Sequence, residues 1–205
     1  MLQAMKNFVG RELARVIPNF SSNFVCSAGN SFLMLGNASA QKMTSLIAAL
    51  NDVDSNPNLV TFVITGTPSA WKDKCNLATT TIFDGIHIRS TPEEYLHLTR
   101  RAVCRARAYL DRWLPVVVLE HAELAKDDIE GLLDLAMTNN VQLIVSLKSL
   151  PRGEQGARVA KRFSRIAVFG AEDSHTLGVL QETRPRMKGL TLADISMART
   201  RHLMV

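Results

Sequence analysis

Short runs of consecutive apolar residues alternate along this chain with segments in which apolar residues recur every three or four positions. Continuous apolar runs bounded by turn residues are typical of strands that are buried on both faces of a sheet. They predict strands at 31–35 (SFLML), 59–65 (LVTFVIT), 115–119 (PVVVL), 141–147 and 165–169. The segment 71–81 is ambiguous, and a brief strand-like run lies within 84–89.

The segments with helical spacing lie between these strands. A strong helix start lies at 90–94, where two hydroxyl residues are followed by Pro92 and two glutamates. The hydroxyl groups can accept hydrogen bonds from the free N–H groups of the first turn, and the glutamates neutralise the positive end of the helix dipole. Helices are predicted over 1–17, 42–50, 91–112, 126–137, 158–163 and 174–181. Alternation over 190–205 predicts one or two edge strands. Apolar strands alternating with helices predict an α/β fold, a mainly parallel sheet with helices on both faces.

Composition narrows the class of protein without identifying it. The chain has 205 residues, a net charge of +5 and no apolar run near the roughly 20 residues that span a bilayer. Charged residues interrupt the first predicted helix, which therefore does not resemble a signal peptide. Three widely spaced cysteines predict neither a zinc ribbon nor a disulfide framework. We expect a cytoplasmic protein that reaches a membrane only through a partner complex.

The stretch GNASAQKM (36–43) stands between the first strand and the helix that follows it. A phosphate-binding P-loop reads G-x-x-x-x-G-K-[ST] at such a place, and its main-chain N–H groups wrap the phosphates. Gly36 and Lys42 are in register with that pattern. Gln41 replaces its second glycine, and Met43 replaces the hydroxyl that would bind magnesium. Taken by itself, this stretch favours an ordinary turn with a solvated lysine.

The stretch PVVVLEHAEL (115–124) is an apolar strand followed by acids. Taken with the loop at 36–43, it resembles the P-loop motor domain of the FtsK/SpoIIIE–HerA superfamily. That family includes DNA translocases, type IV secretion coupling proteins and type VII secretion ATPases, and its strand ends in D-E-F-A-D-L. In an ungapped alignment, Glu120 falls on the catalytic glutamate and Leu119 falls on the aspartate that directs magnesium.

Later stretches match the same family in order. NNVQLIVSLKSLP (139–151) corresponds to the strand ending in A-T-Q-R-P, with Lys148 at the glutamine that senses the γ-phosphate. EDSHTLGVL (172–180) resembles the family's D-S-R-T-I-L segment, and MKGLTL (187–192) resembles its closing P-G-R-G-L. The resemblance implies a RecA-like P-loop domain over 31–205, preceded by an amphipathic helix and lead-in over 1–30.

The departures from the family pattern predict a degenerate nucleotide site. Magnesium loses both of its expected ligands, and phosphoryl transfer depends on that ion to neutralise charge. By resemblance the remaining nucleotide-binding positions are Gly36, Lys42, Met43 and Thr44, with Glu120 as a remnant of the catalytic acid and Lys148 at the sensor position. We expect no obligatory cofactor and no metal site; a bound nucleotide would be ATP or ADP without a well-held magnesium ion.

Two basic clusters are candidate contacts for nucleic acid or a protein partner. Arg101 and Arg105 share a helix face, and Arg112 lies one heptad beyond Arg105. Arg158 and Arg162 belong to a second cluster, where the family often faces its substrate or a neighbouring subunit. The solvated face of a helix fits the first cluster as well, because no aromatic residue is interleaved within it for stacking.

These observations predict a structural, regulatory or interaction subunit of a DNA or protein translocation, secretion or packaging machine. It would be a pseudo-ATPase that binds protein partners, as a homo- or hetero-oligomer, and DNA is a candidate ligand. Two alternatives remain open at this stage. One is an active ATP-hydrolysing motor with unconventional site residues, and the other is a nucleic-acid-binding module without nucleotide chemistry.

Overall fold

The computed structural model describes residues 29–37, 39–52, 58–75, 79–84, 91–120, 122–170, 173–193 and 203–204. The predicted helix over 1–17 and most of the strand-like run at 84–89 lie outside these residues. Within the described part of the chain, no helix is long and apolar enough to cross a membrane.

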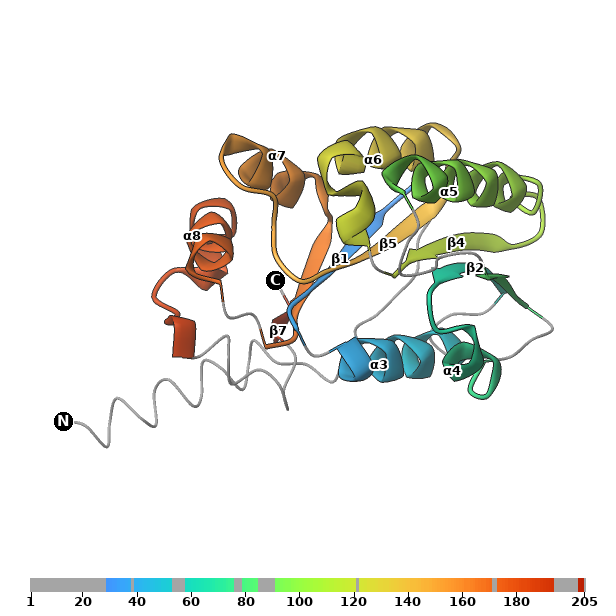
Figure 1. Cartoon of the computed structure of the whole chain (residues 1–205), viewed down its shortest axis with the longest axis horizontal. Coiled ribbons are helices and arrows are strands. Elements are labelled where there is room, and N and C mark those ends of the chain that lie inside the picture. The colour runs from blue at the N-terminus through green and yellow to red at the C-terminus, as the bar shows by residue number, and fades with distance from the viewer. Residues whose placement is uncertain are drawn as a thin grey trace.

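A seven-stranded sheet forms the centre of the described structure (Figure 1). Its strands are β1 (Ser31–Leu35), β2 (Leu59–Thr65), β3 (Thr80–Asp84), β4 (Leu114–Leu119), β5 (Gln142–Leu147), β6 (Arg165–Val168) and β7 (Leu203–Met204). Their order is β3-β2-β4-β5-β1-β6-β7, and only β7 runs antiparallel to its neighbour. The predicted mainly parallel sheet is confirmed, and β5 lies between β1 and β4.

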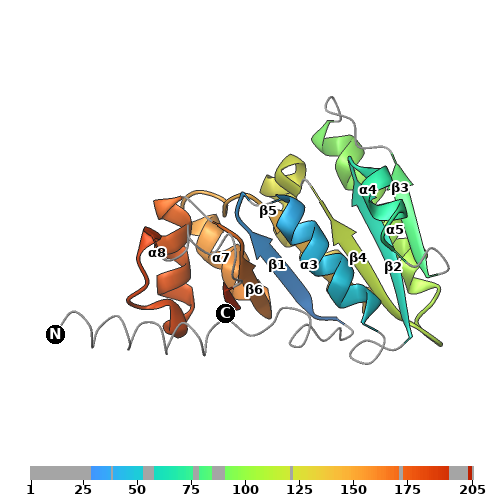
Figure 2. The same ribbon diagram turned by 90° about the horizontal axis from the view of Figure 1, so that it is seen from below.

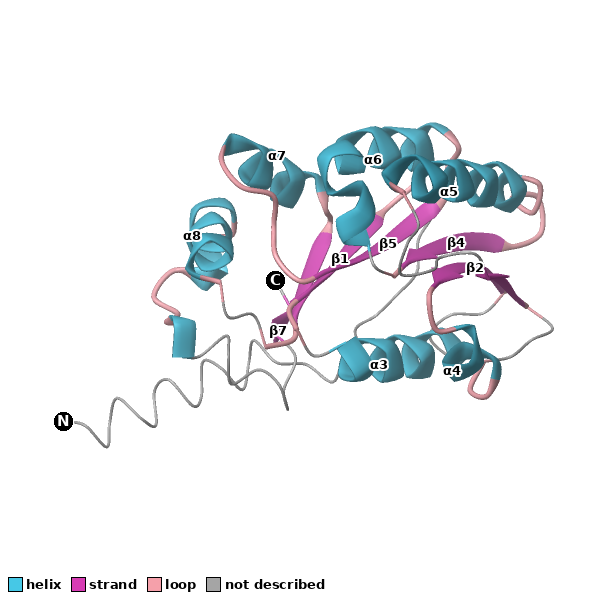
Figure 3. Ribbon diagram, viewed as in Figure 1, coloured by secondary structure: helices cyan, strands magenta, loops and turns pink. Residues whose placement is uncertain are grey.

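Helices cover both faces of this sheet (Figure 3). Figure 1 shows α5, α6 and α7 on one side and α3 and α4 on the other, and α3 and α4 lie in front of the strands in Figure 2. The bounds are α3 (Ser39–Asn51), α4 (Pro68–Lys72), α5 (Pro92–Arg107), α6 (Ile129–Thr138), α7 (Glu154–Arg162) and α8 (Ser174–Thr183), with 3₁₀ helices η1 (Ala122–Asp128) and η2 (Pro185–Met187).

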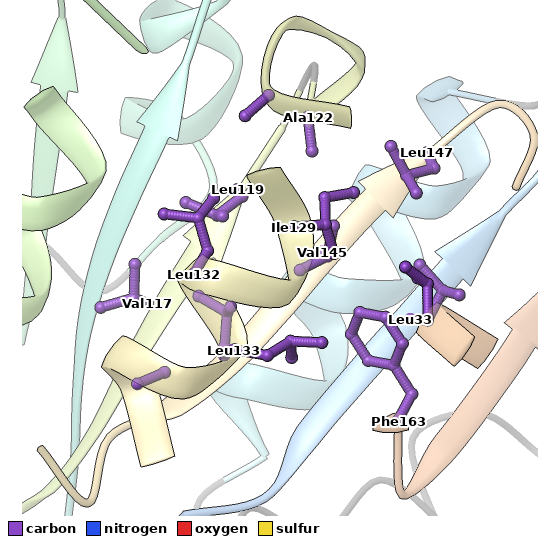
Figure 4. Close-up of a cluster of buried hydrophobic side chains, with 14 of the residues drawn as sticks. Leu33, Val117, Leu119, Ala122, Ile129, Leu132, Leu133, Val145, Leu147 and Phe163 are labelled. Carbon is purple, nitrogen blue, oxygen red and sulfur yellow. The ribbon is translucent and has the colours of Figure 1, made fainter. Parts of the chain in front are cut away.

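Alternate residues of the parallel strands enter two separate apolar clusters. In β1, Leu33 and Leu35 pack under α5, α6 and α7, whereas Phe32 and Met34 pack under α3. This is the period-two alternation of a strand, with hydrocarbon on both faces because both are covered. Figure 4 shows the first cluster, where Leu119 lies between the strands and the turn of chain at Ala122.

Several element boundaries differ from the predicted ones for local reasons. The capping box of Thr91 and Glu94 starts α5 as predicted, but α5 ends at Arg107 because residues 108–113 form a tighter turn. Helix α7 starts at Glu154 rather than 158, directly after Gly153 at φ +67°. Helix α3 starts at Ser39 rather than 42. Helix α4, with five residues, is too short to give a periodic signal.

The carboxyl ends of the six parallel strands lie along one edge of the sheet. Residues that follow β1, β2, β4 and β5 are therefore brought together there although they lie far apart in sequence. This edge holds the residues singled out by the resemblance, and it is the candidate site.

Candidate functional site

The connection between β1 and α3 is short. Only residues 36–38 separate the end of the strand from Ser39, the first helical residue. Gly36 has a φ of +117°, a conformation that side chains rarely adopt. Its N–H donates to the carbonyl of Leu147 at 3.0 Å, and the N–H of Asn37 donates to Gly170 O at 3.4 Å. Two N–H groups of this connection are thus bonded to the protein itself.

Lys42 is buried, with 4% of its surface exposed. Its Nζ donates to the main-chain carbonyl of Leu147 at 3.1 Å. Burial lowers the pKa of Lys42 from 10.5 to about 8, although the nearby carboxylates of Glu123 and Glu120 oppose this and raise it, while Lys148 lowers it. The lysine of the P-loop-like stretch is therefore an inward-facing cation beside two acids, not the solvated side chain of an ordinary turn.

The neighbours of Lys42 in α3 point to different environments. Met43 packs against the apolar cluster beneath α3. Gln41 is half-buried, and Thr44 is exposed. Of the predicted nucleotide-binding positions in this helix, only Lys42 is shown to interact with residues that follow β4 and β5.

Glu120 is held on two sides at the end of β4. Thr65 Oγ1, from the end of the neighbouring strand β2, donates a hydrogen bond to its carboxylate. Thr65 Oγ1 also accepts from the N–H of Thr67 at 2.9 Å. The hydroxyl of the fully buried Tyr95 donates to the carbonyl of Glu120 at 2.7 Å. Strand β2 and helix α5 together fix the position of Glu120, the predicted remnant of the catalytic glutamate.

The residue before Glu120 faces another way. Leu119, at the position of the magnesium-directing aspartate, is fully buried in the apolar cluster with Ala122 and Leu132 (Figure 4). Its neighbours are hydrocarbon, so a charged side chain there would lose its hydration without a partner. Among the described residues, no group of three or more His, Cys, Asp or Glu side chains is arranged to hold a metal ion. His121 lies outside the described residues.

The loop after β5 connects this edge to distant elements. The N–H of Lys148 donates to the carboxylate of Glu123, and Lys126 Nζ donates to Ser149 Oγ at 3.1 Å. Further along, the N–H of Leu150 donates to Thr176 Oγ1 at 3.1 Å. His175 Nε2 lies 2.9 Å from Pro151 O. The loop containing the predicted sensor residue is therefore bonded to η1 on one side and to α8 on the other.

The two basic clusters differ in their partners. Arg158 Nε pairs with Glu130 at 3.2 Å, and Arg162 pairs with Asp134 of the same helix, α6. Arg162 also donates to Glu130 O at 3.2 Å. These two arginines stabilise the packing of α7 on α6. Arg101, Arg105 and Arg112 are exposed, and no carboxylate partner is found for them among the described residues.

Three residues of this edge were not singled out from the sequence: Thr65, Tyr95 and Glu123. Thr65 and Tyr95 reach Glu120 only because β2 is the neighbour of β4 and α5 crosses both, which a single sequence does not reveal. Glu123 did carry a signal, since it occupies the position of the second aspartate in the aligned D-E-F-A-D-L motif.

No family model matches this sequence, and no curated protein matches it. Several solved structures, in contrast, are similar to this chain in fold. The DNA-packaging ATPase B204 of Sulfolobus turreted icosahedral virus aligns over 81% of this chain and 90% of its own, with a TM-score of 0.54 at 11% identity. The genome-packaging NTPase B204 of Sulfolobus turreted icosahedral virus 2, in complex with sulfate, aligns over 80% of this chain and 87% of its own, with a TM-score of 0.54 at 11% identity. The complex of the same NTPase with AMPPCP aligns over 80% of this chain and 88% of its own, with a TM-score of 0.50 at 13% identity.

At these identities the likeness shows the fold alone. The order β3-β2-β4-β5-β1-β6 and the helices on both faces match an α/β RecA-like P-loop fold, which confirms the predicted fold class.

Proposed function

We propose that this chain is a degenerate FtsK/HerA-like ATPase-fold subunit that serves a structural or regulatory role in a genome-packaging or translocation machine. The similar structures are described as a viral DNA-packaging ATPase and a viral genome-packaging NTPase, which supports a machine of this class. The sequence motifs follow the same family in order along the chain.

One observation carries the proposal: both positions expected to hold magnesium have apolar side chains that pack on hydrocarbon. Met43 is partly buried and packs against the apolar cluster beneath α3, and Leu119 is fully buried beneath α6 and η1. Magnesium needs oxygen ligands in near-octahedral geometry, and neither side chain supplies one. Without a held magnesium ion, the negative charge that develops during phosphoryl transfer is poorly neutralised.

The charged groups that remain at this edge already have neighbours within the protein. Lys42 and Lys148 lie near Glu120 and Glu123, and Lys42 Nζ is bonded to Leu147 O. A nucleotide phosphate would have to replace that carbonyl and lie beside two carboxylates. If ATP or ADP binds here, it does so without magnesium and weakly. The chain then acts through its protein partners.

The test is ATP turnover by the purified full chain with magnesium. We expect the rate to equal that of Lys42→Ala and Glu120→Gln variants, which lack the two retained site residues. Lys188→Ala, at an exposed lysine outside the segments that follow β1, β2, β4 and β5, is the matched control. A fluorescent ATP analogue should show weak binding that EDTA does not change. Turnover that requires magnesium and is abolished in both site variants would overturn the proposal.

A second candidate is an active motor whose site is completed by a neighbouring subunit. The geometry of Glu120 favours it, because Thr65 and Tyr95 hold this acid as a catalytic group would be held. The same assay separates the two candidates when it is repeated over a range of protein concentrations, with oligomeric state followed by light scattering. Turnover that appears only with assembly, and is lost in Glu120→Gln, would establish the motor.

A further inference from the structure

A cavity of about 470 Å³ lies toward the edge of the sheet where the parallel strands begin, opposite to the candidate site. Its lining comes from the end of α3, from α4 and the chain after it, and from the first residues of β2 and β3. The N–H of Thr61 donates to Thr79 O at 2.8 Å across the start of these two strands. Of the described residues in the P-loop-like stretch, none lines this cavity, and neither does Glu120 or Lys148. We call it the α3–α4 cavity.

The chain has two tryptophans, and both line the α3–α4 cavity. Trp71 of α4 is fully buried and belongs to the apolar cluster beneath α3. Trp113, directly before β4, is 38% exposed. The N–H of Trp113 donates to Tyr109 O at 2.9 Å, and the N–H of Leu114 donates to Asn58 O at 2.8 Å, so the main chain that carries the exposed ring is fixed. The cavity thus has one buried and one exposed indole in its wall.

The indole N–H of Trp71 is buried without an acceptor among the described residues. Such donors are rare in folded proteins, because a buried N–H has lost its hydrogen bond to water and usually gains another. Since Trp71 has no exposed surface, an acceptor that enters the cavity reaches this N–H only when side chains of the wall shift slightly. The unmet donor therefore favours a ligand that carries a hydrogen-bond acceptor.

The charged lining of the α3–α4 cavity is positive. Among the described residues it contains one ammonium group, that of Lys74, and no carboxylate. No ion pair of Lys74 is found within the described part of the chain. The side-chain amide of Asn51 donates to Lys74 O at 2.8 Å, which ties the end of α3 to the chain after α4. Thr61, Thr79 and Thr80 add hydroxyl groups to the lining residues. This lining favours an anion over a cation.

The size of the α3–α4 cavity is that of a site for a small organic molecule. Such sites usually enclose about 300–1,000 Å³ and combine mostly apolar or aromatic residues with a few polar groups. Leu50, Leu59 and the two tryptophans supply the apolar surface here. These side chains suit a flat ring, and the polar residues around them suit a single charged group on that ring.

We propose that the α3–α4 cavity binds a small planar organic acid of the aromatic carboxylate class. The ring of the ligand stacks on the indole of Trp113 and contacts Leu50 and Leu59. Its carboxylate accepts hydrogen bonds from Lys74 Nζ and from the indole N–H of Trp71. Stacked aromatic rings attract one another beyond their buried area, and a hydrogen bond to a charged group is stronger than one between neutral groups.

This site does not rest on the proposed function. The candidate site is formed by residues that follow strands, whereas the α3–α4 cavity is lined by residues at the start of β2 and β3. Lys42 is not among the lining residues, so the Lys42→Ala variant should bind the acid like the wild type. Loss of ATP turnover and loss of acid binding are therefore separate results.

The test is titration of the ¹⁵N-labelled full chain with 2-naphthoate, followed by the indole N–H signals in ¹H–¹⁵N correlation spectra. Because the chain has two tryptophans, two such signals are expected, and Trp113→Phe identifies the one that belongs to Trp71. We expect both signals to shift and saturate, with the N–H of Trp71 moving downfield as it gains an acceptor. The dissociation constant should be about 0.1–1 mM, as is usual for a small unoptimised ligand.

The variants and a second probe separate the parts of the site. Lys74→Gln should weaken binding about fivefold, whereas Lys72→Gln, at an exposed lysine of α4 outside the lining, should leave it unchanged. Trp113→Ala should weaken binding about fivefold, and Trp113→Phe, which retains a ring, should keep most of the affinity. The probe 2-naphthylmethylamine, with the same ring and the opposite charge, should bind about tenfold more weakly than 2-naphthoate.

Three results would overturn the proposal. The first is the absence of a saturable shift of either indole signal at about ten times the expected dissociation constant. The second is equal or tighter binding of the amine, which would indicate apolar adhesion without recognition of the carboxylate. The third is an equal effect of Lys74→Gln and Lys72→Gln, which would place the ammonium of Lys74 outside the site. The first two results are obtained with the wild type, so they do not depend on the folding of any variant.

Discussion

Lys42 Nζ and the N–H of Gly36 donate to the same acceptor, the carbonyl of Leu147, at 3.1 and 3.0 Å. Leu147 is the last residue of β5, so both ends of the P-loop-like stretch are bonded to the strand that precedes the sensor position. In a working phosphate loop, the ammonium neutralises phosphate oxygens. Here it donates a hydrogen bond to a main-chain carbonyl and lies near the carboxylates of Glu123 and Glu120.

Replacing Lys42 with methionine should stabilise the protein at pH 7. Burial lowers the pKa of Lys42 to about 8 from 10.5, so the unfolded chain holds a proton that the folded chain releases between these values. The stability of the wild type therefore rises as the pH increases from about 8 to 10.5. The difference between these pKa values corresponds to a cost of about 3 kcal/mol in the free energy of unfolding of the wild type below pH 8. Losing the hydrogen bond to Leu147 costs the variant about 1 kcal/mol. We therefore expect Lys42→Met to be more stable than the wild type by about 2 kcal/mol at pH 7.

The measurement is urea unfolding of wild type and Lys42→Met from pH 7 to pH 10. Their difference should be largest at pH 7 and should shrink as the pH rises. The free energies of unfolding of the two proteins are subtracted at each pH, because Cys75 makes its own contribution to both. Burial raises the pKa of Cys75 from 9.0 to about 11, so the stability of both proteins falls between these pH values. Lys188→Met, at an exposed lysine, is the control. A pH-independent difference would show that Lys42 is not desolvated as the structure indicates.

Removing the hydroxyl of Thr65 should destabilise the protein and free Glu120. Thr65→Val preserves shape but leaves the carboxylate of Glu120 and the N–H of Thr67 without this partner. A lost hydrogen bond to a charged group costs about 1.5–3 kcal/mol. Thr61→Val, in the same strand β2, is the matched control and should change the free energy of unfolding less. Equal effects of the two substitutions would contradict a special role for the Thr65 hydroxyl.

Removing the hydroxyl of Tyr95 should destabilise the protein by about 1–2 kcal/mol. Tyr95→Phe keeps the ring in the core but leaves the carbonyl of Glu120 without the donor that lies 2.7 Å away. Tyr109→Phe, at an exposed tyrosine, should change stability by less than about 0.5 kcal/mol. Thermal and urea unfolding of both variants check this, and a Tyr95→Phe protein as stable as the wild type would mean that water satisfies the carbonyl.

The class of fold follows from the sequence because its signals are local. Val116 to Leu119 and Leu143 to Val145 are apolar at every position, and such runs occur in strands covered on both faces. The capping box at Thr91 likewise acts over three residues. These features depend on neighbours in the chain, so the elements that they predict are present in the structure.

The pairing of residues across the sheet does not follow from the sequence. Which strand lies beside β4 determines that Thr65 reaches Glu120, and that choice rests on long-range packing. The environment of Lys42 is also non-local, since Leu147 lies 105 residues further along the chain.

Adding one methyl group at Gly156 should destabilise the protein, whereas the same change at Gly178 should stabilise it. A Cβ at Gly156 would lie 2.4 Å from the main-chain oxygen of Pro151, so α7 would have to move away from the loop that bonds to α8. Overpacking of this kind costs about 1–3 kcal/mol. Gly178 lies in α8 with nothing within 4 Å of an added Cβ, and alanine there removes the entropic cost of a helical glycine, worth about 0.5–1 kcal/mol. Urea unfolding of Gly156→Ala and Gly178→Ala tests both signs together. Equal shifts in the same direction would contradict the close approach of α7 to Pro151, and with it the path by which the loop after β5 connects the candidate site to α8.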